Sequence, residues 1–284
     1  MADKRSIIKV AREIFMVKIE QKERQPDYLI IGAQKSGTTS LYAYLNQHPQ
    51  VVPAEQKEVH FFDLNFSNGV EWYRQQFARM AKSISPENES YSEDKYVRGF
   101  ITGEASPYYV FHPLVPQRVY QTFPQVKLIL LLRNPVNRAI SHYYHEVKLG
   151  FESLSLEDAI AQEETRLKDE TEKLLTQENY YSFNHQHYTY LSRGKYVEQL
   201  TDWLKFFPKE QMLIIKTEEL DNQPDMIMDR VWEFLKLPPR PIVQYEKYNS
   251  NDYPPVDESL YNQLTSYFQP DNQKLKDSFG ISFD

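Results

Sequence analysis

The sequence predicts an α/β protein, with a single three-layer α/β/α domain built around a central parallel sheet. An apolar strand at residues 28–31 runs through a glycine-containing loop directly into a helix. A second apolar run, residues 127–132, has the continuous hydrophobicity of a strand buried on both faces, and a helix follows it as well. No internal repeat divides the 284 residues, so we expect one domain.

The N-terminal segment has a different pattern from the rest of the chain. Between residues 5 and 24, apolar residues alternate with charged ones at helical spacing, which predicts an amphipathic helix. We therefore divide the chain into residues 1–25, an amphipathic helix or linker, and residues 26–284, the enzymatic domain. Three roles stay open for the helix: packing on the domain, joining it to an upstream domain, or docking on a partner.

Composition limits the function further. The net charge of −7 argues against general nucleic-acid binding, and the absence of cysteine excludes disulfides and thiolate chemistry. The sequence contains no run of about 18 apolar residues, so it predicts no membrane span, and its N-terminus lacks a signal-peptide pattern. We expect a cytoplasmic protein of bacterial origin, with a soluble domain of a larger protein as the alternative.

Residues 32–39, Gly-Ala-Gln-Lys-Ser-Gly-Thr-Thr, have the composition of an anion-binding loop. Loop and first-turn N–H groups lack intrahelical partners, and the helix dipole adds positive potential there. Lys35 and the hydroxyls of Ser36, Thr38, Thr39 and Ser40 supply further donors around Gly37. A standard P-loop has lysine directly after its second glycine, where this chain has Thr38. The alternative is a tight turn with a solvated lysine.

A second candidate anion site follows the apolar run 127–132. Arg133 stands at the strand end where Walker-type nucleotide triphosphatases carry a carboxylate for Mg²⁺. An arginine there favours a second phosphate or another anionic group, and Ser141 lies eight residues further on in the following helix. A surface arginine without function is the alternative.

Residues 57–63, Lys-Glu-Val-His-Phe-Phe-Asp, contain a candidate acid/base pair. If the segment is extended, Glu58 and His60 project on the same side. A carboxylate beside an imidazole is suited to proton transfer. Spacing alone favours the alternative, which is a salt bridge at the rim of a site or a hydrogen-bonded histidine.

The remaining pattern predicts helices, a short extended piece at residues 51–53, a short strand that begins at residue 98 and closes in a polar turn at 103–109, one further strand, and a short tail. The expected helices cover residues 69–77, 114–123, 156–175, 197–207, 225–235 and 260–268, and the further strand covers 212–215. Residues 82–97 read as a polar loop, and residues 180–190 as an Asn/His/Tyr-rich rim facing an acceptor. His185 and His187 lack a third ligand nearby, so we predict no metal site.

These motifs together resemble the sulfotransferases that use 3′-phosphoadenosine 5′-phosphosulfate (PAPS). The likeness is greatest to the branch with heparan sulfate 3-O- and N-sulfotransferases and their bacterial relatives, and it runs from about residue 28 to residue 283. It includes Gly69-x-x-Trp72-Tyr73 and the stretch from Trp203 to Pro208.

The resemblance implies a role for each motif. The glycine loop, from Lys35 to Ser40, would bind the 5′-phosphosulfate, and Arg133 with Ser141 the 3′-phosphate. Arg193 and Tyr196 are expected to contact the cofactor too. Glu58 would take the proton of an acceptor hydroxyl, aided by His60, while Lys35 neutralises charge on the departing adenosine 3′,5′-bisphosphate (PAP) and no metal is needed. Substrate contacts are expected from Lys57, Ser106 and Tyr108.

Two departures bear on the acceptor. The glycosaminoglycan enzymes carry a Lys-Gly-Arg turn where this chain has residues 249–251, Asn-Ser-Asn, and a lysine where it has Ala105. A heavily anionic polysaccharide therefore fits less well, and a neutral sugar, a lipid, a phenol or an acyl chain on a carrier protein stay open. The rival functions are an ATP-dependent kinase with a degenerate P-loop and a non-catalytic nucleotide-binding module.

Overall fold

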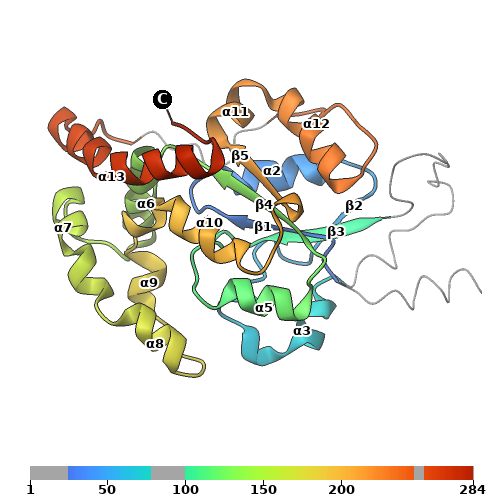
Figure 1. Cartoon of the computed structure of the whole chain (residues 1–284), viewed down its shortest axis with the longest axis horizontal. Coiled ribbons are helices and arrows are strands. Elements are labelled where there is room, and N and C mark those ends of the chain that lie inside the picture. The colour runs from blue at the N-terminus through green and yellow to red at the C-terminus, as the bar shows by residue number, and fades with distance from the viewer. Residues whose placement is uncertain (1–24, 78–99, 246–252, 284) are drawn as a thin grey trace, which may run out of the picture.

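A computed structural model describes residues 25–77, 100–245 and 253–283, and its centre is a five-stranded parallel sheet (Figure 1). The strands are β1 (Tyr28–Gly32), β2 (Val51–Pro53), β3 (Ile101–Ala105), β4 (Lys127–Leu132) and β5 (Met212–Lys216). They lie in the order β2-β3-β1-β4-β5, and every neighbouring pair is parallel. The predicted fold class is thereby confirmed.

Helices connect the strands and cover the sheet. They are α2 (Thr38–Leu45), α3 (Val70–Gln75), α5 (Val115–Thr122), α6 (Pro135–Leu149), α7 (Leu156–Leu167), α8 (Glu170–Thr176), α9 (Phe183–His187), α10 (Tyr196–Leu204), α11 (Thr217–Asn222), α12 (Pro224–Leu235) and α13 (Glu258–Phe279). Short 3₁₀ turns occupy Phe66–Asn68, Ser192–Gly194 and Lys209–Gln211. Among the described residues, no helix is both long and apolar enough to span a membrane.

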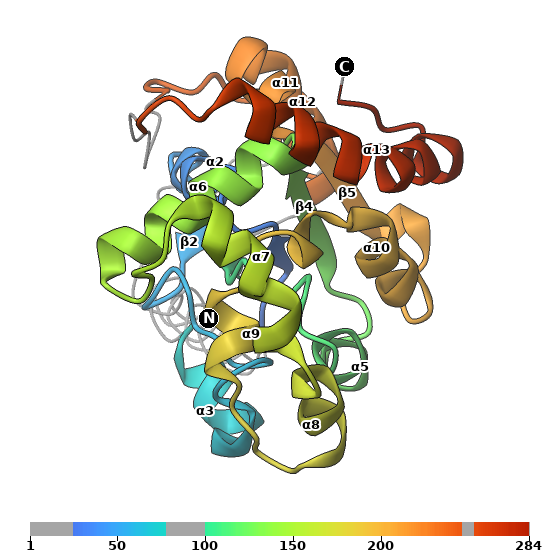
Figure 2. The same ribbon diagram turned by 90° about the vertical axis from the view of Figure 1, so that its left-hand side faces the viewer.

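Alternate residues of each central strand enter two different cores. Leu29 and Ile31 of β1 belong to the core beneath α3, α5 and α10, whereas Tyr28 and Ile30 belong to the core beneath α2 and α12. The central strands are therefore apolar without interruption, because both their faces are buried. A third cluster joins α6, α7 and α13 beyond the sheet, and Figure 2 shows α6, α7 and α9 together on that side.

Parallel pairing brings the carboxyl ends of the strands to one edge of the sheet. The glycine loop follows β1 there, between the turn after β3 and the start of α6 after β4. The fit is tight at Gly32, whose φ is 154°, because a Cβ on it would lie 2.5 Å from Val110 Cγ1. A side chain at position 32 would therefore push the turn after β3 away from the loop.

Two predicted helices have different lengths in the structure. The helix expected over 156–175 is two helices, α7 and α8, separated at Asp169 with φ 62°. Glu170, at the start of α8, accepts a hydrogen bond from the Tyr180 hydroxyl at 2.8 Å, which draws α8 toward that later segment. The last helix continues to Phe279 through Pro270, because buried residues recur at helical spacing as far as Leu275.

Three predictions lie outside the described residues. They are the amphipathic helix at 5–24, the polar loop at 82–97 and the Asn-Ser-Asn sequence at 249–251.

Candidate active site

The glycine loop is fastened by its carbonyl groups. Arg133 Nη1 donates to the Lys35 carbonyl at 3.2 Å, and Thr217 Oγ1 donates to the Ser36 carbonyl at 2.7 Å. Lys35 and Gly37 have φ values of 69° and 87°. Successive left-handed and right-handed residues turn main-chain N–H groups toward one point, which is the geometry of an anion-binding nest. The loop thus has a geometry suited to an anion, and two of its carbonyl groups are bonded to Arg133 and Thr217.

Lys35 is a half-buried cation in this loop. Burial lowers the pKa of its ammonium, nearby Tyr253 opposes that change, and Arg133 adds to it. An anion bound between Lys35 and Arg133 would relieve the repulsion of the two cations. The residue predicted for the second anion site, Arg133, is thus in direct contact with the main chain of the first.

Ser141 has a partner that the sequence analysis did not foresee. Its hydroxyl lies 2.9 Å from the hydroxyl of Tyr253, which precedes α13. The Tyr253 ring stacks on Tyr144, with ring centroids 4.8 Å apart and planes 9° apart. The segment before α13 thereby lies over the predicted 3′-phosphate site. Tyr253 stands in a tyrosine- and proline-rich stretch, and nothing in that pattern singles it out.

Arg193 and Tyr196 hold the loop and the end of β4 in place. The buried Arg193 guanidinium donates to the Gln34 side chain and to the carbonyls of His185 (3.2 Å) and Gln186 (2.6 Å). Burial lowers its pKa to about 10, so it stays charged at neutral pH. The Tyr196 hydroxyl donates to the Arg133 carbonyl at 2.8 Å. Direct cofactor contact by either residue stays a prediction.

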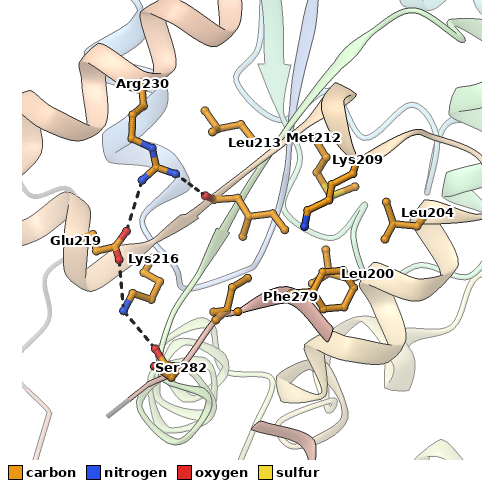
Figure 3. A pocket seen from close by; sticks show the side chains of 13 residues that line it. Leu200, Leu204, Lys209, Met212, Leu213, Lys216, Glu219, Arg230, Phe279 and Ser282 are labelled. Atoms are coloured by element: carbon orange, nitrogen blue, oxygen red, sulfur yellow. Dashed lines mark hydrogen bonds and ion pairs between the residues drawn. The ribbon is translucent and has the colours of Figure 1, made fainter. Parts of the chain in front are cut away.

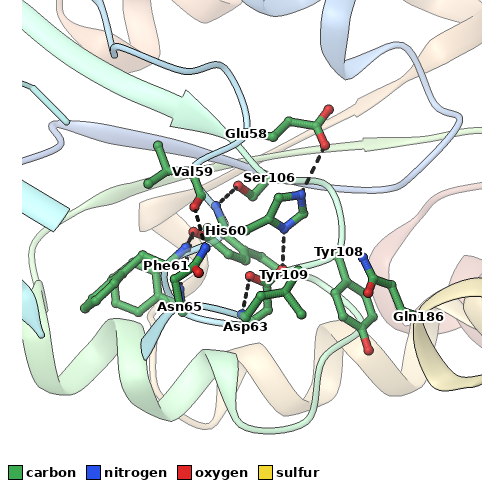
Figure 4. Close-up of polar contacts among 12 residues, drawn as sticks. Glu58, Val59, His60, Phe61, Asp63, Asn65, Ser106, Tyr108, Tyr109 and Gln186 are labelled. Carbon is green, nitrogen blue, oxygen red and sulfur yellow. Dashed lines mark hydrogen bonds and ion pairs between the residues drawn. The ribbon is translucent and has the colours of Figure 1, made fainter. Parts of the chain in front are cut away.

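The segment with Glu58 and His60 is a turn instead of an extended strand. His60 has φ 52°, so the expected alternation of side chains does not occur. The two side chains still meet, with Glu58 Oε2 at 3.3 Å from His60 Nε2 (Figure 4). Lys57 Nζ lies 2.5 Å from Glu58 Oε1, and His60 Nδ1 lies 2.8 Å from Asp63 Oδ2. The two side chains thus lie together, on a different backbone from the expected one, within a chain of four charged groups. Their acid/base role stays a prediction.

This chain of charges shifts both central pKa values. Burial raises the pKa of the Glu58 carboxyl, but the hydrogen bond from His60 and the charge of Lys57 prevail and bring it to about 2. Burial lowers the pKa of His60, but the hydrogen bonds and charges of Asp63 and Glu58 prevail and raise it to about 10. Glu58 is therefore an anion, and His60 a cation, throughout the neutral range.

A fully buried carboxylate, Glu104, anchors this turn. Its Oε2 accepts from the Ser106 hydroxyl at 2.6 Å and the Val59 N–H at 3.4 Å. Its Oε1 accepts from the hydroxyls of Tyr109 (2.7 Å) and Tyr73 (3.1 Å). We call these residues the Glu104 network, comprising Tyr73, Glu104, Ser106 and Tyr109. Burial raises the pKa of Glu104 to about 7, against the lowering effect of these donors.

The Glu104 network binds four consecutive N–H groups of the turn. Val59 N–H reaches Glu104 itself, His60 N–H donates to Ser106 Oγ at 3.0 Å, and the next two donate to Tyr109 Oη at 2.8 and 3.4 Å. Because the turn has no regular secondary structure, these contacts fix its left-handed residue. The sequence analysis missed Glu104, since an acidic residue on a short strand carries no signal of burial.

The predicted substrate contacts lie at different depths. Ser106 is fully buried and belongs to the Glu104 network. Tyr108 is also buried; its hydroxyl lies 2.7 Å from His185 Nδ1, and Arg193 covers its ring at 4.6 Å. Lys57, with 23% of its side chain exposed, remains accessible beside Glu58.

A separate cavity of about 400 Å³ lies against β5 and the C-terminal segment (Figure 3). Its lining shares no residue with the glycine loop or with residues 57–63. Glu219 lies between two of its cations, 3.4 Å from Lys216 Nζ and 3.7 Å from Arg230 Nη1. Glu219 thus pairs with two of the three cations in the lining, and we assign the cavity no role.

Within the described parts of the chain, no three His, Asp or Glu side chains gather as a metal ion would need. His185 is paired with Tyr108, and His187 Nδ1 lies 2.8 Å from Glu146 Oε2. Both histidines thus have side-chain partners within the protein, and the expectation that they bind no metal stays a prediction.

The raised pKa of His60 predicts a pH dependence of stability. A raised folded-state pKa contributes stabilisation that is complete below the ordinary value of 6.5 and is lost as the pH rises through about 10. We expect the difference in unfolding free energy between the wild type and His60→Gln to shrink across this interval, measured by urea denaturation. Nitrogen-15 NMR should show a protonated His60 at about pH 8. A neutral ring there would contradict the charge assignment.

Comparisons with known proteins agree with this geometry. A sequence profile of the sulfotransferase domain matches residues 25–265. Heparan sulfate glucosamine 3-O-sulfotransferase 5 of Mus musculus is 33% identical over 278 residues, covering 89% of this chain and 72% of that protein. Membrane-associated sulfotransferase kil1 of Dictyostelium discoideum is 27% identical over 315 residues, covering 88% of this chain. This chain spans 64% of the Dictyostelium protein, less than two thirds of its length.

A solved structure shows the same fold. The crystal structure of a sulfotransferase from Alicyclobacillus acidocaldarius superposes with a TM-score of 0.68 at 28% identity, covering 91% of this chain and 97% of that one. The profile match extends over most of the chain and includes the glycine loop, Glu58 and Arg133. On this basis, the chain belongs to the sulfotransferase family.

Proposed function

We propose that this chain transfers the sulfuryl group of PAPS to the hydroxyl of an acceptor by in-line displacement, with Glu58 as the base. The observation that carries the proposal is the meeting of three parts at one sheet edge. The glycine loop, Arg133 and the Glu58–His60 pair come from three different strand ends. Two anion sites beside a proton acceptor are what such a transfer needs.

The residues present fit the cofactor. Lys35, Ser36, Gly37, Thr38, Thr39 and Ser40 would hold the phosphosulfate end. Arg133 and Ser141 would hold the 3′-phosphate, with Tyr253 beside them. Bound PAPS supplies the sulfuryl group and leaves as PAP.

Glu58 is suited to accept a hydrogen bond from the acceptor hydroxyl. Its pKa of about 2 makes it ionised but weakly basic while His60 and Lys57 contact it. Proton transfer is then favourable only once the hydroxyl oxygen has begun to bond to sulfur and has become acidic. We infer that the proton moves to Glu58 together with the attack.

The neighbouring cations have distinct tasks. Lys35 neutralises charge that develops on the oxygen linking sulfur to the leaving phosphate. His60, held by Asp63 at 2.8 Å, orients the Glu58 carboxylate. Lys57 lies against the other Glu58 oxygen and reaches the acceptor side.

The rival functions fit the observed site less well. A kinase would need a carboxylate for Mg²⁺ at the end of β4, where Arg133 stands and binds the glycine loop. A non-catalytic nucleotide-binding module would need neither the Glu58–His60 pair nor the Glu104 network that holds it.

The acceptor is a hydroxyl-bearing sugar, lipid or carrier-bound chain in this proposal, and no nucleic acid takes part. The mouse relative is named for heparan sulfate, but Ala105 stands where the resembling glycosaminoglycan enzymes carry lysine. We propose a cytoplasmic location, with residues 1–25 as the link to an upstream domain or docking partner.

Substituting Glu58→Gln tests the base. The amide keeps the size of the side chain but cannot take the proton, so we expect activity to fall at least about 100-fold. PAP affinity, measured by isothermal titration calorimetry, should stay within about two-fold of the wild type, since the phosphate residues are intact. A variant that keeps most of its turnover would remove Glu58 from this role.

Arg133→Ala tests the cofactor assignment. Loss of a charge-assisted, half-buried contact should weaken PAP binding by roughly 2–4 kcal/mol in metal-free titrations. A matched control is Arg230→Ala, which removes an arginine from the cavity against β5. Unchanged PAP affinity in Arg133→Ala would make Arg133 a structural residue and remove it from the cofactor site. Binding of ATP only, and only with Mg²⁺, would overturn the proposed function in favour of the kinase.

Glu104→Gln tests whether the buried carboxylate positions the turn with Glu58. An amide nitrogen cannot accept from the donors that surround Glu104, so the turn should shift and kcat fall about 10- to 100-fold. Tyr109→Phe should act in the same direction, because it frees the two N–H groups bound to that hydroxyl. PAP affinity should be unchanged in both. Parallel losses of kcat and PAP affinity would indicate general structural damage instead.

A further inference from the structure

We propose that the acceptor is an uncharged sugar whose ring stacks on a group of aromatic side chains at the protein surface. This group lies beside the turn at residues 57–63, which carries Glu58 and which we call the catalytic turn. We call this group the aromatic cluster; it consists of the exposed residues Phe151, Tyr181 and Phe183 and of His187, whose side chain is 13% exposed beneath them. The inference rests on the proposed sulfuryl transfer and adds the class of acceptor to it.

The aromatic cluster is a continuous surface feature. Phe183 lies 4.3 Å from the His187 ring and 5.3 Å from the Phe151 ring, measured between centroids, and Phe151 lies 4.7 Å from His187. Phe151, Phe183 and Tyr181 are 41%, 36% and 51% exposed. Large aromatic side chains left together in solvent usually mark a recognition surface.

The aromatic cluster opens toward the catalytic groups. His145, on α6, interacts electrostatically with Lys35, Glu58 and His187. Tyr181 interacts in the same way with Tyr108, which is next to the catalytic turn, and with Glu146. Figure 2 places α6, α7 and α9 on one side of the molecule. Direct contacts agree with this placement: the Tyr108 hydroxyl lies 2.7 Å from His185 Nδ1, and Arg193 donates to both the Gln186 carbonyl of α9 and the Gln34 side chain of the glycine loop. An acceptor held on the aromatic cluster would thus approach Glu58 from the α9 side.

Buried groups hold one ring of the cluster rigidly. Glu146 is 1% exposed, and its Oε2 lies 2.8 Å from His187 Nδ1 while its Oε1 lies 3.1 Å from His142 Nε2. These contacts leave His187 Nε2 directed outward, 3.5 Å from the Tyr181 hydroxyl. Ring faces and hydrogen-bonding groups thus stand side by side, as a sugar requires for its apolar face and its hydroxyl edge.

The charge of the surrounding segment disfavours an anionic acceptor. Residues 151–190 contain nine aspartates and glutamates but three lysines and arginines. Two of these cations are paired: Arg166 Nη1 lies 2.5 Å from Glu152, and Lys173 Nζ lies 2.8 Å from Glu170. A sulfated or carboxylated chain would meet net negative charge here and would be repelled. An acyl chain would remain in contact with water on such open rings.

The test measures sulfation of three acceptor types by the full chain with PAPS, detected by mass spectrometry. The acceptors are a panel of neutral 4-nitrophenyl pyranosides, the matching glucuronide, and dodecanol. We expect turnover of at least one neutral glycoside, with kcat/KM at least about ten-fold above that of the glucuronide or dodecanol.

Variants locate the subsite. Phe183→Ala and Tyr181→Ala should each raise KM for the neutral glycoside about ten-fold while kcat and PAP affinity stay within about two-fold, because only acceptor stacking is lost. Tyr120→Ala is the matched control, since Tyr120 is 44% exposed but lies on α5, where it packs at an angle against Phe206 and Phe207. It should change none of these values.

The outcomes separate the two proposals. Turnover of the glucuronide or dodecanol in preference to every neutral glycoside, or an unchanged KM in both variants, would overturn the aromatic cluster as a sugar site and leave the sulfuryl transfer standing. No turnover of any acceptor together with no PAP binding would overturn the proposed function itself. PAP binding without turnover of any neutral glycoside would also reject the sugar as the acceptor class.

Discussion

The whole site depends on the parallel pairing of β1 with β3 on one side and β4 on the other. This pairing fixes the glycine loop between the turn after β3, which carries Ser106, and the end of β4, which carries Arg133. Arg133 then binds the main-chain carbonyl of Lys35, while the turn at residues 57–63 is tied to β3 through Glu104. Glu58 and Arg133, which are 75 residues apart in sequence, are thereby brought to the same edge of the sheet.

Electrostatics divides the site into two halves with opposite requirements. In the phosphate half, burial and the nearby charge of Arg133 destabilise the protonated form of Lys35. A bound anion would relieve this destabilisation, which would favour binding of the anionic ligand. In the acceptor half, Lys57, Glu58, His60 and Asp63 compensate one another already. The hydroxyl of an acceptor therefore meets a Glu58 carboxylate that is already paired with Lys57 and His60. It must compete for Glu58, which keeps the carboxylate from acting on water.

Local sequence patterns predicted the parts that depend on local physics. The glycine loop and the buried strand before Arg133 follow from residue type and spacing over fewer than ten residues. Glu58 and His60 do meet, but not through the extended backbone that the spacing assumed, because His60 is left-handed. The Glu104 network, the Tyr253–Ser141 contact and the engagement of Arg193 with Gln34 do not follow from local spacing, because their partners come from separate elements. The expected single helix over 156–175 failed for a related reason, since Glu170 is drawn to Tyr180 and Ser182 by tertiary contacts that override helix propensity.

The division between buried supports and exposed recognition groups explains how such a site can change its acceptor. Glu58 needs accurate placement for in-line transfer, yet its turn has no main-chain ladder, so its position comes from side-chain bonds that Glu104 and Tyr109 make to the main chain. Those supports are sealed inside the domain. The aromatic cluster belongs instead to α9 and the connections around it, which extend beyond the sheet and contribute nothing to the Glu104 network. Substitutions there can alter which hydroxyl is presented without moving the base that activates it.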